Sequence, residues 1–124
     1  MSPIPVLFVD ASPPFRRLVV RLLERYFAAE VTLVAECEHW PPPQLPPITP
    51  KAVLLGLGGA GLTDPQLIAS IHDLLPGVPV IVLGHLKEPA YRQAALAAGA
   101  AGFVAKEALS TELIPLLRHI VHPT

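Results

Sequence analysis

The sequence predicts an α/β fold, a doubly wound sheet of five parallel strands. Short apolar runs alternate along the chain with segments whose apolar residues repeat at helical spacing. The runs are almost uninterrupted, as is typical of parallel strands covered on both faces. Hydrophobic residues make up 52% of the 124 residues and charged residues 15%, which indicates a buried core and excludes disorder. Right-handed crossovers between parallel strands would place helices on both faces of the sheet.

The first strand is predicted over 4–9 (IPVLFV), and a helix follows it over 15–27. Ser12 precedes two prolines, an arrangement typical of a helix start. Apolar residues in this helix repeat at helical spacing, and the ones predicted to face the core are Phe15, Leu18, Val19, Leu22 and Tyr26. A short, β-rich second strand is predicted over 31–35.

Residues 37–50 are predicted to be an irregular, proline-rich segment in place of the second crossover helix. Six prolines fall between Trp40 and Pro50, and proline removes an amide donor and clashes with the preceding helical turn. The side chains available to cover the sheet face here are Trp40, Leu45 and Ile48. Two alternatives are open. The segment folds back as a lid, or it leaves Trp40 and a bare apolar face as a docking or homodimer surface.

The rest of the chain continues the alternation, and 1–124 is expected to be a single domain. The predicted elements are a strand over 52–57, a helix after the Thr63–Gln66 capping box, a strand over 78–83, a helix over 88–98 ended by Gly99, a strand over 102–105 and a helix capped by Ser110.

In such a sheet, ligand chemistry collects at the carboxyl ends of the strands. The residues that fall there are Asp10, Ala11, Gly56, Gly84 and Lys106. A formal net charge of -1 gives no long-range field for nucleic acid, and no apolar stretch is long enough for a membrane span. One cysteine, Cys37, is consistent with a reducing cytoplasm.

The stretch 78–120 contains an AALAAGA turn and a GFVAK fifth strand, and it resembles the receiver domain of response regulators in two-component signalling. The resemblance extends over the chain outside 37–50. It implies a flavodoxin-like fold with strand order 2-1-3-4-5. It also implies a site in which two acids after the first strand and a phosphoacceptor aspartate at the third hold magnesium. A hydroxyl after the fourth strand and a lysine after the fifth would contact the phosphoryl group.

Asp10 and Lys106 match two of the five positions of this pattern, whereas the other three positions do not match. Ala11 replaces the second acid, Gly56 the phosphoacceptor and Gly84 the hydroxyl. Glycine cannot accept a phosphoryl group, and one carboxylate is too little for a hard divalent cation. The sequence therefore predicts a degenerate pseudo-receiver that is not an enzyme and has no catalytic residue, cofactor or metal.

Two further side chains of this site are predicted to have structural roles only. Lys106 is predicted to form an ion pair with Asp10, as a remnant of the site. Phe103 stands where the resemblance places an aromatic switch residue, and with no hydroxyl at Gly84 to engage it, burial in the core is predicted.

The predicted function is a phosphorylation-independent protein-interaction domain of a bacterial two-component-type system, cytoplasmic, with a protein partner or a second copy. Candidate interaction residues are Trp40 and a stripe on the first helix, Val20, Leu23 and Phe27. In the alternative, the last helix covers this stripe. The runner-up function is a small-ligand or anion sensor that uses Lys106 and the strand-end crevice. The loop 56–61 (GLGGAG) matches a dinucleotide motif, but Thr63 and Asp64 start the helix after the last glycine, and Asp64 would repel phosphate.

Overall fold

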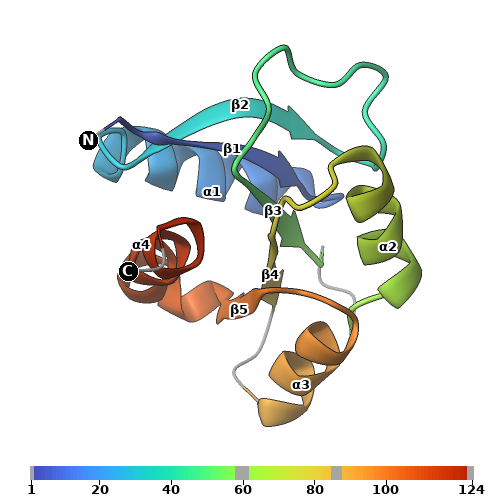
Figure 1. The fold of residues 1–124 in the computed structure, drawn as a ribbon. Helices are drawn as coiled ribbons and strands as arrows, with labels where there is room; N and C mark the ends of the chain where they lie inside the picture. The colour runs from blue at the N-terminus through green and yellow to red at the C-terminus, as the bar shows by residue number, and fades with distance from the viewer. Residues whose placement is uncertain (1, 58–61, 85–87, 123–124) are drawn as a thin grey trace.

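The computed structural model describes residues 2–57, 62–84 and 88–122 and confirms the doubly wound sheet. Its five strands are all parallel and lie in the order β2-β1-β3-β4-β5, as the resemblance implied (Figure 1). The strands are β1 (Ile4–Val9), β2 (Val31–Cys37), β3 (Ala52–Gly56), β4 (Val80–Gly84) and β5 (Gly102–Ala105).

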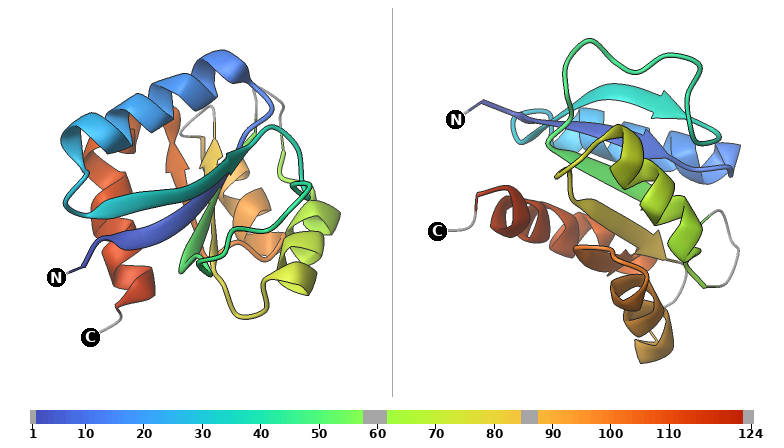
Figure 2. Two further views of the ribbon diagram at one scale, coloured as in Figure 1. Left: turned by 90° about the horizontal axis from the view of Figure 1, so that it is seen from above. Right: turned by 45° about the vertical axis from the view of Figure 1, so that its right-hand side comes forward.

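Helices cover both faces of the sheet. The helices are α1 (Pro13–Tyr26), α2 (Pro65–Leu74), α3 (Pro89–Ala97) and α4 (Leu109–Val121), with a 3-10 turn η1 (Lys106–Ala108) before the last. Helices α1 and α4 lie on one face, and α2 and α3 lie on the other (Figure 2). None of the helices in the described part of the chain has the length and apolar character needed to cross a membrane.

The sheet separates two apolar clusters. Val6 and Phe8 of β1 belong to the cluster under α1 and α4, whereas Leu7 and Val9 belong to the cluster under α2 and α3. Successive side chains of a strand point to opposite faces, so a strand between two helical layers must be apolar throughout. This explains the uninterrupted apolar runs in the sequence.

The buried face of α1 differs from the predicted one. Phe15, Val19 and Leu23 are buried, whereas Leu18 is 60% exposed and Tyr26 is 66% exposed. The predicted interaction stripe is therefore wrong at Leu23, which lies in one cluster with Leu113 and Leu117 of α4. Val20 and Phe27 are half-buried against the same cluster. Helix α1 carries apolar residues on several sides, so its packing against the sheet and against residues of α4 selects the face that is buried.

Two predicted helix caps also differ. Asp64, not Thr63, is the N-cap of α2, and its carboxylate accepts a hydrogen bond from the Gln66 amide at 2.9 Å. Helix α4 begins at Leu109, so Ser110 lies inside its first turn and does not cap it. The reason is η1, which carries the chain from β5 directly into the helix.

The proline-rich segment between β2 and β3 has neither helix nor strand over 38–51, as predicted, except that Cys37 completes β2. It arcs away from the sheet near α2 (Figures 1 and 2). Trp40 packs against the cluster under α2 and α3, but Leu45 is 37% exposed and Ile48 is 59% exposed. Trp40 alone therefore acts as the lid, and the other two side chains point outward.

Candidate functional site

Asp10 follows β1 and is fully buried, at 0% exposure. Its Oδ1 accepts a hydrogen bond from the Ser12 amide at 2.7 Å, while its Oδ2 is buried without a hydrogen-bond partner. The Arg16 guanidinium donates to the Asp10 carbonyl oxygen at 2.7 Å and lies 3.5 Å from the Glu36 carboxylate. Arg16 therefore ties α1 to the ends of β1 and β2, a role that its place in the sequence did not signal.

Gly56 ends β3 directly beside the Asp10 carboxylate. A Cβ atom added to Gly56 would collide with Oδ2 and Cγ of Asp10. The space in which a side chain at position 56 would begin is therefore occupied by the surviving acid. The structure brings these two predicted site residues into contact.

Gly84 and Phe103 form a second filled position. A Cβ atom added to Gly84 would collide with Cε2 and Cζ of the Phe103 ring. The ring is 2% exposed and belongs to the cluster under α2 and α3, so Phe103 is buried as expected. The guanidinium carbon of Arg92 lies 5.6 Å from the ring centroid. The ring thus takes the volume that a hydroxyl-bearing side chain at position 84 would need.

Lys106 does not form the predicted ion pair with Asp10. Its Nζ lies 3.7 Å from the centroid of the Phe15 ring, in a cation–π contact. Lys106 begins η1 one residue after Ala105, which faces the α2 and α3 side, so its own side chain leaves on the α1 side, where Phe15 lies. Burial lowers the pKa of Lys106, and the Asp10 charge opposes this shift.

The magnesium ion that the resemblance implied does not fit these residues. Ala11 is exposed and has no side-chain oxygen, and Gly56 has no side chain. Among the described residues, no three His, Cys, Asp or Glu side chains are placed to hold a metal ion. Asp10 would be a lone carboxylate ligand, and hard divalent cations take several oxygen ligands.

A hollow opens beside the same strand ends. Its volume is about 350 Å³, and its lining includes Ala11, Gly56 and Trp40, together with residues of the proline-rich segment and of α2. The sequence analysis did not predict that the start of α2 lines this hollow. Residues 11 and 64 are far apart along the chain, so only the folded structure shows that they lie beside the same hollow. Lys106 is not among the described lining residues.

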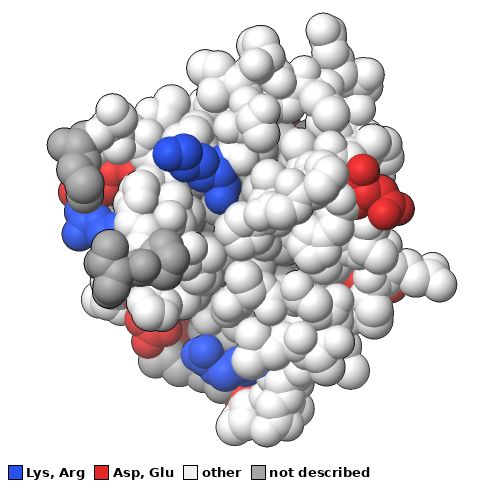
Figure 3. All heavy atoms as spheres, viewed as in Figure 1, with Lys and Arg blue, Asp and Glu red and all other residues white. Residues whose placement is uncertain are grey.

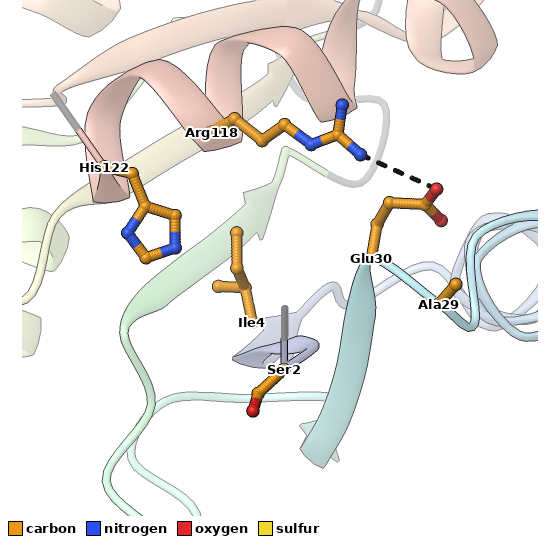
Figure 4. A pocket seen from close by; sticks show the side chains of 6 residues that line it. All are labelled: Ser2, Ile4, Ala29, Glu30, Arg118 and His122. Atoms are coloured by element: carbon orange, nitrogen blue, oxygen red, sulfur yellow. Dashed lines mark ion pairs between the residues drawn. The ribbon is translucent and has the colours of Figure 1, made fainter. Parts of the chain in front are cut away.

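A second hollow, of about 330 Å³, lies at the opposite end of the sheet (Figure 4). Its lining includes Ile4 at the start of β1, Glu30 before β2, Arg118 of α4 and His122 directly after that helix. Arg118 and Glu30 form an ion pair at 3.6 Å across it. Pairs this exposed stabilise a fold by only about 0–1 kcal/mol, so the pair helps to position α4 and little more.

Asp10→Asn is expected to remove part of the pH dependence of stability. Burial, the largest cause, raises the Asp10 pKa, while the Ser12 amide, Lys106 and Arg16 oppose the rise. A carboxyl whose folded-state pKa exceeds its unfolded value stabilises the fold below the unfolded pKa. That contribution is lost as pH rises through the folded pKa. The variant should therefore gain thermal stability relative to the wild type as pH rises from about 4 towards neutrality. If the difference in melting temperature between the two proteins stays constant across this pH range, Asp10 is not the source of the pH dependence.

The fold is shared with response-regulator receiver domains. No family model matches the sequence, and no curated protein matches it. The signal receiver domain of NarL from Mycobacterium tuberculosis is 24% identical, with a TM-score of 0.73 and full coverage of both chains. RcsB from Salmonella typhimurium is 23% identical over 97% of this chain, with a TM-score of 0.71. The chain spans 60% of the length of that RcsB chain.

A LuxR-family two-component response regulator from Aurantimonas is 22% identical over 98% of this chain and 87% of its own, with a TM-score of 0.72. The structural match extends over the whole of the NarL receiver domain. The chain therefore has the fold of the response-regulator receiver domains.

Proposed function

We propose that the chain is a pseudo-receiver, a protein-interaction domain of a bacterial two-component-type system that signals in the cytoplasm without phosphorylation. The observation that carries the proposal is the contact between Asp10 and Gly56. The space beside Gly56 is occupied by a carboxylate, so the site has neither an acceptor side chain nor room for one. The structural neighbours are receivers of response regulators, which supports a place in this kind of signalling.

Exposed apolar side chains support an interaction role. Leu18 and Tyr26 lie on the outer side of α1, and Leu45 and Ile48 project from the proline-rich segment. A protein partner or a second copy of the chain would cover these side chains. The formal net charge of -1 gives the domain no long-range field to attract nucleic acid, and charged side chains are few and separated on the face shown in Figure 3.

The anion-sensor alternative has less support. The Lys106 ammonium lies over Phe15, and the described lining of the strand-end hollow contains no Lys or Arg. Residues 58–61 of the GLGGAG loop lie outside the described residues.

Phosphodonors are expected to leave the protein unchanged. Beryllium fluoride with magnesium should cause no shift of the amide NMR resonances around Asp10, because Gly56 has no carboxylate to bind the fluoride complex. Acetyl phosphate should add no acid-labile phosphate, as measured by intact mass. A receiver with a complete site, treated in parallel, is the positive control. A magnesium-dependent shift near Asp10, or a phosphate adduct, would contradict the proposal.

A further inference from the structure

The hollow at the strand ends has the character of a binding pocket. Its volume of about 350 Å³ lies within the range of small-molecule sites, roughly 300–1,000 Å³. Its walls include the side chains of Trp40, Leu57, Leu62 and Leu67. Leu62 is 63% exposed, which is a large exposure for a leucine beside a concave surface. An apolar ligand body would cover it.

Two changes from the receiver pattern create this pocket. Ala11 lines it where the resemblance expects a second carboxylate. The proline-rich segment brings Trp40 to the pocket where a crossover helix is expected, and its indole N–H is buried without a hydrogen-bond partner. The absence of an acidic side chain at position 11 and the absence of the crossover helix thus leave one largely apolar hollow.

The charge of the pocket selects the ligand. Glu38 and Asp64 contribute carboxylates to its lining, His39 contributes an imidazole, and no Lys or Arg is among its described residues. Both acids are exposed, and their carboxylates disfavour an anionic ligand. Carboxylates beside an apolar wall suit a cation with an apolar body, because the carboxylates pair with its charge and the wall covers its apolar atoms.

We propose that this pocket binds a small organic cation, an amine carried on an aromatic or aliphatic body. The body lies against Trp40 and the leucines, and the ammonium group faces Glu38 and Asp64. This function is additional to the proposed interaction role and does not rest on it. A domain that fails to bind amines would still be inert to phosphodonors.

Trp40 is the only tryptophan, so its fluorescence reports on the pocket. Three probes with one phenyl body separate charge from shape: 2-phenylethylamine, 2-phenylethanol and 3-phenylpropionate. The amine should give a saturable change in Trp40 emission, the alcohol a weaker one and the carboxylate none. This comparison uses the unaltered chain and depends on no variant.

Variants test whether the amine binds in this pocket. The double variant Glu38→Gln with Asp64→Asn should weaken amine binding about tenfold, as two partly exposed charge pairs allow, and leave the alcohol unchanged. Asparagine is as good an N-cap as aspartate, so α2 is retained. Glu112→Gln removes an exposed carboxylate on α4 and is the matched control, with no expected effect. Ala11→Leu should fill the pocket and abolish the response to the amine and the alcohol.

Three outcomes would overturn the proposal. The first is an absence of any saturable change with the amine. The second is equal or tighter binding of the carboxylate, which would favour an anion site. The third is amine binding that survives both Ala11→Leu and the double variant, which would place the amine elsewhere on the protein.

Discussion

Gly84→Ala should destabilise the protein by about 2 kcal/mol, within the range for overpacking a core. The added methyl group would enter the volume of the Phe103 ring, and that ring is fully enclosed by the cluster under α2 and α3. A rigid aromatic ring cannot turn away without moving its neighbours, since core side chains are close-packed. Threonine at this position, which would restore a hydroxyl, adds more atoms to the same collision and should cost more.

Gly102→Ala in β5 is the matched control. Its Cβ would meet the Leu116 Cδ2 at 2.9 Å and the Ile120 Cδ1 at 3.2 Å, both at the ends of flexible side chains. This variant should therefore cost less than about 1 kcal/mol. Urea unfolding of both variants measures the difference. The cost of Gly84→Ala should fall in a Phe103→Leu background, as a double-mutant cycle would show. Equal costs at Gly84 and Gly102 would refute the idea that Phe103 fills the site.

Gly56→Asp should restore the phosphoacceptor residue without restoring phosphorylation, and it should destabilise the fold by at least about 2 kcal/mol. The new Cβ would collide with the Asp10 carboxylate. The second acid would also lie beside a buried one, and two neighbouring carboxylates disfavour each other's charged form. Ala11 and Gly84 would still lack the groups that hold the metal and contact the phosphoryl oxygens.

Two companion variants separate these causes. Gly56→Ala introduces the collision without the charge, so its cost measures the steric part alone. Gly56→Asp in an Asp10→Ala background removes the collision and the repulsion, and it should recover much of the lost stability while remaining unphosphorylated. Chemical unfolding measures stability, and intact mass after acetyl phosphate treatment measures phosphorylation. Acid-labile phosphate on the Gly56→Asp single variant would mean that Asp10 moves aside and that the groups absent at Ala11 and Gly84 are not needed for phosphorylation.

At both glycines, the space that a side chain would need is already occupied by a neighbouring residue. Asp10 takes the space beside Gly56, and Phe103 takes the space beside Gly84. A single reversion at either glycine therefore meets an occupied volume, and phosphotransfer chemistry could return only through several coupled changes.

The sequence alone determined the sheet. The predicted bounds of β1 (Ile4–Val9) and β5 (Gly102–Ala105) agree with the structure residue for residue. Parallel strands buried on both faces leave continuous apolar runs that local sequence reveals. The run of prolines excluded a second crossover helix for an equally local reason, the missing amide donors. The missing site groups could also be read directly, because glycine and alanine have no side chain that could accept phosphate.

Only the tertiary structure decided what occupies the space those residues leave. The local sequence around Gly56 and Gly84 does not predict that Asp10 and Phe103 occupy the space beside them. Asp10 follows β1 and Phe103 lies in β5, so each side chain comes from another part of the chain. The Lys106 ammonium lies over Phe15 of α1, and the buried face of α1 depends on the sheet and on α4. Local periodicity names the residues that can be buried, but when a helix is apolar on several sides, packing between distant elements selects the ones that are.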